Sequence, residues 1–214
     1  SITPALSEST QTGITYLLDR RTGKPVAPIE DRPVPQGNLP GERYSPTQPY
    51  SSMPNIGNEV LKESDMWGAT PFDQLMCRIR FKSSRYEGIF TLPGLDTAIQ
   101  YPGSLGGINW GCVSVDPTTN LMFVNDLRLG LYYKMVAAKD IPPGQGTGEG
   151  IGWIVQKGLP FGTVRERLMS PLGVPCQAPP FGTMTAIDLK TRKIAWQIPV
   201  GTVQDTGPLG IATG

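Results

Sequence analysis

The side chains best suited to chemistry follow an apolar segment near the middle of the chain. Leu121–Val124 is apolar, and Asn125, Asp126 and Arg128 come directly after it. An amide, a carboxylate and a guanidinium together can bind or orient a polar ligand. We expect the three to converge where a strand ends and a loop begins, because a β scaffold usually carries its functional groups there.

Two apolar segments that flank a turn are expected to position these groups. Cys112–Val115 and Leu121–Val124 are short and rich in Val, and Asp116–Asn120 between them reads Asp-Pro-Thr-Thr-Asn. Asp-Pro followed by Thr and Asn is typical of a turn, so the pattern predicts two paired strands. Alternation along the second strand places Phe123 and Asn125 on one face.

The composition excludes several classes of function. The chain has no histidine, which excludes Ser-His catalysis and histidine-ligated metals. The three cysteines have no CxxC spacing, so no zinc site is expected. With 19 basic and 18 acidic residues, no basic surface for nucleic acid is predicted. No apolar run approaches the ~18 residues that a membrane helix needs.

Glycine and proline are abundant, with 26 and 22 residues in a chain of 214. This favours many short strands joined by long loops. Pro25–Pro54 is predicted to be an ordered surface excursion, and Ile141–Gly152 a flexible loop. Ile79–Lys82 alternates apolar and basic residues, which predicts a half-exposed strand.

One pattern occurs twice. Asp19–Lys24 and Asp188–Lys193 both read Asp-x-x-Thr-x-Lys, between segments that we expect to be strands. The second copy lies within Ala186–Trp196, which resembles the tryptophan-docking motif of quinoprotein propeller blades, with Arg192 in place of a glycine. The first copy has Ala27 where the tryptophan is expected. Asp and Thr brace such turns, and any hairpin turn can contain them.

Further motifs extend the resemblance. Gly106–Gly111 (GGINWG), Ser114–Pro117 (SVDP) and Val124–Asp126 (VND) are similar to membrane-bound quinoprotein dehydrogenases of the glucose/quinate/shikimate family, which use pyrroloquinoline quinone (PQQ). The similarity runs over essentially the whole chain. It implies an all-β fold: part of an eight-bladed propeller with long Pro/Gly-rich loops, and residues 1–214 as one piece of that domain.

The resemblance implies a periplasmic enzyme on the bacterial inner membrane, anchored by an N-terminal segment that this chain lacks. A cyclic polyol, quinate or shikimate, or else glucose, would be oxidised by hydride transfer to PQQ beside a divalent cation (Ca or Mg). Electrons would then pass to ubiquinone. The chain opens without methionine and ends in loop-like sequence, so we expect a fragment that is inactive alone and lacks the catalytic aspartate.

The resemblance also implies roles for individual residues. Asn125 matches an asparagine that hydrogen-bonds the cofactor, and Asn109 and Trp110 are expected to line the same channel. The residues leave open that Asn125 only caps a strand and that Trp110 packs between blades. Gln11 stands where the family has a lysine that contacts the quinone carbonyl, so activation of the quinone should be weaker.

Arg128 is the candidate for substrate selection, because a guanidinium can grip the carboxylate of quinate or shikimate. The alternative is that Arg128 pairs with Asp126 or with another carboxylate. Asp126 is expected to be a solvated loop carboxylate, with a place beside the metal as the alternative. Cys77 and Cys176 lie in matched segments, and a periplasmic location would permit a disulfide between them.

A function from a different class is a non-catalytic β-propeller scaffold that binds other proteins. Such scaffolds share the tryptophan-docking repeats but lack the Asn-Trp-Gly run and the Asn125 segment, so the sequence favours the dehydrogenase.

Overall fold

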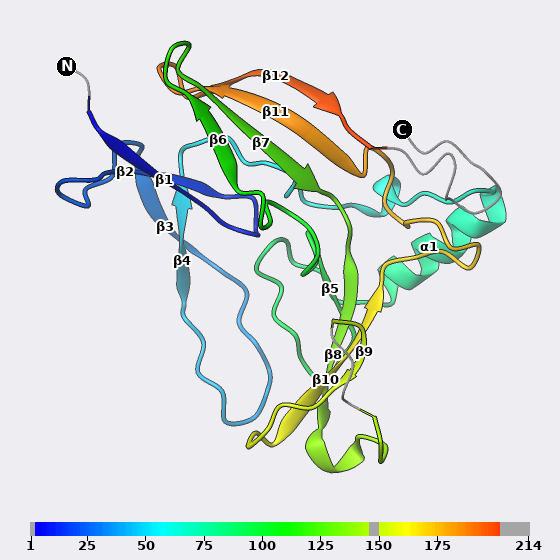
Figure 1. The fold of residues 1–214 in the computed structure, drawn as a ribbon. Helices are drawn as coiled ribbons and strands as arrows, with labels where there is room; N and C mark the ends of the chain where they lie inside the picture. The colour runs from blue at the N-terminus through cyan, green and yellow to red at the C-terminus, as the bar shows by residue number, and fades with distance from the viewer. Residues whose placement is uncertain (1–2, 146–149, 202–214) are drawn as a thin grey trace.

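The computed structural model describes residues 3–145 and 150–201. Short antiparallel strands form separate sheets, and the one α-helix of the described residues lies at one side of the molecule (Figure 1). The elements are β1 (Ala5–Ser9), β2 (Thr15–Asp19), β3 (Ile29–Pro33), β4 (Thr47–Ser51), α1 (Pro71–Lys82), β5 (Ala98–Gln100), β6 (Val113–Asp116), β7 (Leu121–Leu127), β8 (Leu131–Ala137), β9 (Gly152–Ile154), β10 (Phe161–Arg167), β11 (Gly182–Asp188) and β12 (Lys193–Pro199), with 3-10 turns at Glu63–Asp65 and Ala138–Asp140.

Two four-stranded sheets dominate the fold. The first, which we call the β7 sheet, has the order β12-β11-β7-β6. The second, the β8 sheet, has the order β5-β8-β10-β9. The chain leaves the β7 sheet after β7, builds most of the β8 sheet and returns at β11, so the β8 sheet projects from the β7 sheet (Figure 1). The hairpins β1-β2 and β3-β4 complete the described sheets.

The predicted hairpin around Asp116–Asn120 is confirmed. β6 pairs antiparallel with β7, from Asp116 opposite Leu121 to Val113 opposite Val124. The Asp116 side chain accepts hydrogen bonds from the Thr118 amide and the Thr119 hydroxyl, and Asn120 takes a positive φ of 59°. Asn tolerates that conformation better than most residues, which explains its place at the end of the turn.

Both Asp-x-x-Thr-x-Lys segments form tight turns of the same kind. Asp19 accepts from the Arg21 amide, and Asp188 from the Lys190 amide. Gly23 and Arg192 occupy the matching position with φ of 70° and 57°. Glycine adopts this conformation without cost, whereas arginine must accept some strain there.

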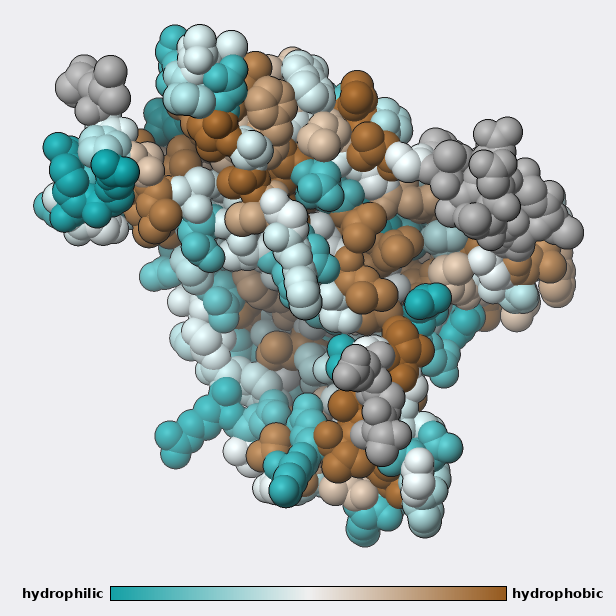
Figure 2. Space-filling view, viewed as in Figure 1, coloured by the Kyte–Doolittle hydropathy of each residue, from teal (hydrophilic) through white to brown (hydrophobic). Residues whose placement is uncertain are grey.

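Trp196 packs against its own sheet. Ala186 lies between Trp196 and Phe123 in the register of β12, β11 and β7. Its small side chain lets the two rings approach to 6.0 Å between centroids. Trp196 is 40% exposed and Ile198 is 51% exposed, so apolar surface remains open on this part of the sheet. Figure 2 shows hydrophobic residues gathered over the same region.

The expected strand at Ile79–Lys82 is wrong, because these residues form the last turn of α1. Thr70 caps the helix by accepting from the Asp73 amide, and Pro71 occupies its first turn, where no amide hydrogen is needed. Thr70 and Pro71, which start the helix, lie eight or more residues before Ile79. The helix that they begin continues through Ile79–Lys82, although the alternation of these residues is typical of a strand.

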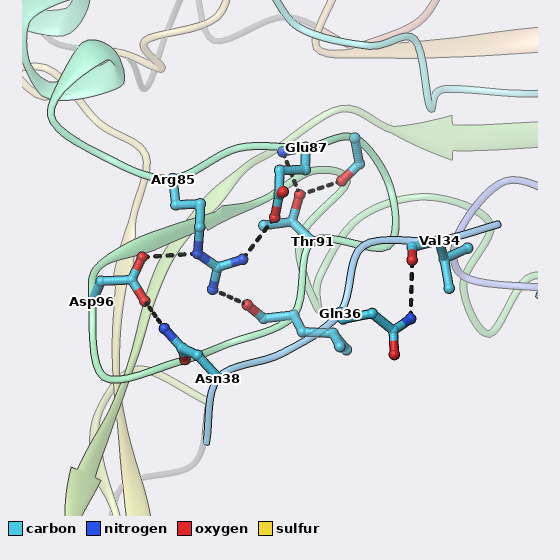
Figure 3. A network of polar contacts seen from close by, with 9 residues as sticks. Val34, Gln36, Asn38, Arg85, Glu87, Thr91 and Asp96 are labelled. Carbon is cyan, nitrogen blue, oxygen red and sulfur yellow. Dashed lines mark hydrogen bonds and ion pairs between the residues drawn. The ribbon is translucent and has the colours of Figure 1, made fainter. Parts of the chain in front are cut away.

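The Pro-rich excursion is ordered, as predicted, and contains β3 and β4. Its tip is joined to the segment before β5 by a polar network around Arg85 (Figure 3). Arg85 Nε donates to Asp96 Oδ2 at 2.8 Å, and Asn38 Nδ2 donates to Asp96 Oδ1 at 3.4 Å. The hydrogen bond from Arg85 holds the pKa of Asp96 below its usual range. Part of the loop predicted at Ile141–Gly152 lies outside the described residues.

Two apolar clusters hold the fold together. One packs the buried face of the β7 sheet against the N-terminal hairpins, and the other packs the β8 sheet against α1. The first contains Leu17, Ala27, Met53, Ile56, Ile108, Met122, Val124 and Ile187. The second contains Leu61, Met66, Cys77, Ile99, Tyr101, Tyr132, Leu168 and Cys176.

A disulfide lies inside the second cluster. Cys77 of α1 and Cys176 before β11 are bonded, across a separation of 99 residues, and both are fully buried. Cys112 is exposed and free. The bond therefore ties the helix to the connection that leads back into the β7 sheet.

Replacing Cys77 and Cys176 together by serine should lower the free energy of unfolding by about 2–4 kcal/mol, since the cross-link restricts a long loop of the unfolded chain. Thermal and denaturant unfolding of the full-length protein would measure this. Cys112→Ser is the matched control and should leave stability unchanged; an equal loss in both variants would contradict the assignment.

Candidate functional site

Three segments that are distant in sequence meet beside the exposed face of β7. Gly107 and Leu127 exchange two backbone hydrogen bonds, of 2.7 and 3.1 Å, which dock the loop before β6 onto the end of β7. A side chain at Gly107, whose φ is 65°, would overlap the carbonyl of Gln11. Glycine at this position therefore lets the Gln11 loop approach the GGINWG segment.

Gln11 and Asn109 face each other across this contact. Gln11 Nε2 donates to Asn109 Oδ1 at 3.4 Å, and Gln11 is exposed. Trp110, the next residue, is 96% exposed and packs against nothing in the described part of the chain. The alternative for Trp110 was packing between blades. The described residues do not form such a contact with it.

Asn125 belongs to the same surface. It is exposed on β7, and its Oδ1 lies 3.4 Å from the position that a Cβ on Gly111 would take. Among the described residues its amide has no hydrogen-bond partner. The structure therefore brings together Asn125, Asn109, Trp110 and Gln11 as an uncharged surface of amides and one indole, with free hydrogen-bonding groups.

The expected convergence of Asn125 with Asp126 and Arg128 is wrong. β7 continues to Leu127, so Asn125 lies inside the strand and not at its end. Alternation then places Asn125 on the exposed face, and Asp126 and Arg128 on the buried one. The two sets of polar groups lie on opposite sides of the sheet.

Asp126 is not the solvated carboxylate that we expected. It is 1% exposed, accepts from Arg128 Nε at 2.8 Å through Oδ2, and accepts from the Thr183 hydroxyl through Oδ1. A Cβ on Gly57 would lie 2.5 Å from Oδ2, so only a glycine allows that loop to cover the carboxylate. Burial of the charge is compensated by these partners.

Arg128 forms ion pairs with carboxylates of the chain itself, which was the alternative to binding a substrate. Besides Asp126, its NH1 lies 3.3 Å from Glu59 Oε1. Burial opposes its charge, yet the hydrogen bond and charge of Asp126, with the charge of Glu59, raise the pKa of Arg128 above the ordinary value. Its substrate role is not tested by these contacts and stays a prediction.

The segment 56–59 connects the buried pair to the amide surface. Asn58 is 6% exposed and its Nδ2 donates to the Thr12 carbonyl at 2.7 Å, next to Gln11. The Ile56 amide donates to the Gly13 carbonyl at 3.0 Å. Sequence reasoning missed Gly57, Asn58, Glu59 and Thr183, because contacts across 46 to 69 positions leave no local pattern.

The described residues contain no group of three or more His, Cys, Asp or Glu side chains arranged to hold a metal ion. No helix in the described part of the chain is long and apolar enough to cross a membrane.

The four-stranded antiparallel β7 sheet with its side-chain-braced turns agrees with the propeller blade that the sequence predicts, and comparison with known proteins identifies the family. Residues 1–214 match the PQQ family described as "Glucose/ethanol/alcohol dehydrogenase, beta-propeller domain". The chain belongs to this family. The expected all-β fold, part of a propeller with long Pro/Gly-rich loops, is confirmed.

Individual relatives agree with the family assignment. The chain is 56% identical over 218 residues to the quinate/shikimate dehydrogenase (quinone) of Acinetobacter baylyi, and 52% identical over 217 residues to a probable quinate dehydrogenase (quinone) of Xanthomonas campestris; 99% of the chain is covered in each. It is 39% identical over 211 residues to the quinoprotein glucose dehydrogenase of Escherichia coli, with 96% covered. The chain spans 26–28% of these relatives' length.

Arg128→Ala should lower the free energy of unfolding of the full-length protein by about 3 kcal/mol, because it leaves the buried Asp126 carboxylate without its cation. Arg21→Ala is the control: Arg21 pairs with Asp19 at 2.9 Å on the surface and its loss should change little. Chemical denaturation measures both. Equal effects would show that the Arg128 pair does not stabilise the fold.

Proposed function

We propose that the protein to which this chain belongs oxidises a cyclic polyol, quinate or shikimate, with PQQ as the hydride acceptor and ubiquinone as the final acceptor. It would act at the periplasmic side of the bacterial inner membrane, held there by an anchor outside this chain. Residues 1–214 would be one part of its propeller domain, inactive alone. The surface formed by Asn125, Asn109, Trp110 and Gln11 carries this proposal.

That surface fits PQQ chemically. PQQ is flat and carries carbonyl and carboxylate oxygens, which need hydrogen-bond donors and a planar partner. Asn125 has a free amide for such an oxygen, and the 96% exposed Trp110 offers an indole on which a flat ring system can stack. Among the described residues, apart from the chain neighbours of Gly111, only Asn125 Oδ1 lies within 4 Å of the position that a Cβ on Gly111 would take, so the loop leaves room for a ligand.

PQQ, when bound, supplies an electron-accepting quinone. Asn125 would donate an amide hydrogen to one of its oxygens. Asn109 would hold the Gln11 side chain in place through the Oδ1–Nε2 contact. Gln11 would then supply a neutral donor, which stabilises negative charge on a reduced oxygen less than a cation does. A divalent cation, calcium or magnesium, is proposed from the resemblance alone, and none of these roles depends on it.

Quinate and shikimate are favoured over glucose by similarity, since the chain is 56% identical to a quinate/shikimate dehydrogenase and 39% identical to a glucose dehydrogenase. We retain Arg128 as a proposed selector of the substrate carboxylate. For that role its guanidinium must exchange Glu59, which is 61% exposed, for the substrate. The substrate must also reach PQQ past the end of β7, because Arg128 and Asn125 lie on opposite sides of the sheet. Glucose oxidation is the alternative within the family, and a non-catalytic scaffold is the alternative outside it.

Full-length protein reconstituted with PQQ and calcium should reduce an artificial dye with quinate or shikimate and not with glucose. Asn125→Ala should weaken PQQ binding roughly 10-fold, because a loss of this size corresponds to about one hydrogen bond from the amide to a charged oxygen of PQQ. Asn38→Ala, which alters an amide in the Arg85 network, is the control and should bind PQQ normally.

Different failures have different meanings. Turnover of glucose alone would refute the quinate assignment, and an unchanged KM for quinate in Arg128→Ala would refute the selector role. Absence of PQQ binding would leave only the scaffold.

Gln11→Lys should raise kcat at least 10-fold, because an ammonium group stabilises charge developing on the quinone oxygen better than an amide. Gln11→Met, of similar length and without a donor, should lower it. Steady-state turnover with saturating PQQ and quinate measures both variants. Equal kcat in all three proteins would show that residue 11 does not contact the reacting group.

A further inference from the structure

A separate hollow lies on the β8 sheet, away from the amide surface. Its volume is about 390 Å³, within the usual range for ligand pockets. Arg80 of α1 and one face of β8, β9 and β10 form its walls. Figure 1 shows this sheet projecting from the β7 sheet. The GGINWG, SVDP and VND motifs that carry the predicted cofactor residues lie on the β7 sheet and its loops, so they assign nothing to this hollow.

The strand register explains why functional groups gather there. Val164 of β10 pairs with Lys134 of β8 on one side and with Trp153 of β9 on the other. Tyr132 lies two residues before Lys134, on the same face, and pairs with Glu166. Residues directly opposite each other share a face, so an ammonium, an indole and a phenol line one hollow.

Tyr132 contributes an unused donor. It is 4% exposed and its hydroxyl is buried with no hydrogen-bond partner, a costly state that the described residues do not relieve. Burial raises its pKa to about 12, so the hydroxyl keeps its proton at neutral pH. Arg80 lies over the Tyr132 ring, with its guanidinium carbon 4.2 Å from the centroid.

The hollow carries more positive than negative charge, since Arg80 and Lys134 line it together with Glu166. Glu166, the acid in its wall, already accepts from Arg80 NH2 at 3.2 Å. Lys134 is exposed, and no carboxylate of the described residues lies within 4.0 Å of its ammonium. An unpaired cation and an unpaired hydroxyl donor in one hollow favour an anion with several acceptor oxygens.

We propose that this hollow binds a phosphate monoester whose apolar or aromatic body rests on Trp153, with Lys134 and the Tyr132 hydroxyl donating to the phosphate oxygens. A soluble phosphate ester and an anionic lipid headgroup share this chemistry. The inference is independent of the proposed PQQ site, which lies on another sheet.

Phenyl phosphate, titrated calorimetrically into the full-length protein at low ionic strength, is expected to bind with a Kd below ~1 mM. Lys134→Ala should weaken binding at least 10-fold and Tyr132→Phe about 5-fold, the latter without removing the ring beneath Arg80. Lys139→Ala is the matched control: this exposed lysine follows the same strand outside the hollow, and its loss should leave the Kd unchanged. Circular dichroism and Tm verify that each variant is folded.

Vesicles identify the source of the phosphate. Binding to vesicles that contain phosphatidic acid, whose headgroup is a phosphate monoester, but not to phosphatidylcholine vesicles, that is lost in Lys134→Ala supports the site with a lipid headgroup as its ligand. Phenyl phosphate binding without vesicle binding supports a soluble ester. No binding of either probe overturns the proposal, as does binding that Lys134→Ala and Tyr132→Phe leave unchanged in folded protein.

Discussion

The buried ion pair between Asp126 and Arg128 is the interaction on which the rest of the arrangement depends. A carboxylate that is 1% exposed is stable there only because Arg128, Thr183 and the closely approaching Gly57 surround it. Those partners come from β11 and from the segment before α1, so the pair joins three parts of the chain. Arg128 also fixes the backbone, since Gln177 donates to its carbonyl.

β7 separates this buried network from the candidate cofactor surface by alternation alone. Asn125 and Asp126 are neighbours in sequence, yet one faces the open side of the sheet and the other the core. A shift of the register by one residue would exchange them, leaving an amide in the core and a charge on the surface. Such a shift would break the hydrogen bonds of Asp126 with Arg128 and Thr183. The buried Asp126–Arg128 pair therefore keeps Asn125 on the open face without having to contact a ligand.

The parts of the fold that the sequence predicts are those with a local physical cause. The turn at Asp116–Asn120, both Asp-x-x-Thr turns and the β11-β12 hairpin that contains Trp196 follow from side chains that hydrogen-bond backbone amides within four residues. Asn125, Asn109 and Trp110 were predicted through motifs; the structure places them near one another, and their role toward the cofactor stays a proposal. The end of β7 was misjudged because polar residues normally end strands, whereas here Thr183 and Glu59, distant in sequence, stabilise Asp126 and Arg128 inside. Sequence reasoning also missed Tyr132 and Trp153, because they line one hollow only through the register of β8, β10 and β9.

The two sheets also differ in how their polar groups are used, and this difference argues for separate roles. On the buried face of the β7 sheet the charged groups are mutually paired, and its open face carries neutral amides beside an apolar surface. On the β8 sheet a buried hydroxyl and an exposed ammonium remain without partners among the described residues. An unpaired buried donor lowers stability unless a ligand satisfies it at least part of the time. β8, β9 and β10 lie between β7 and β11 in the chain but form a different sheet, so the two sheets can carry different roles without sharing a strand.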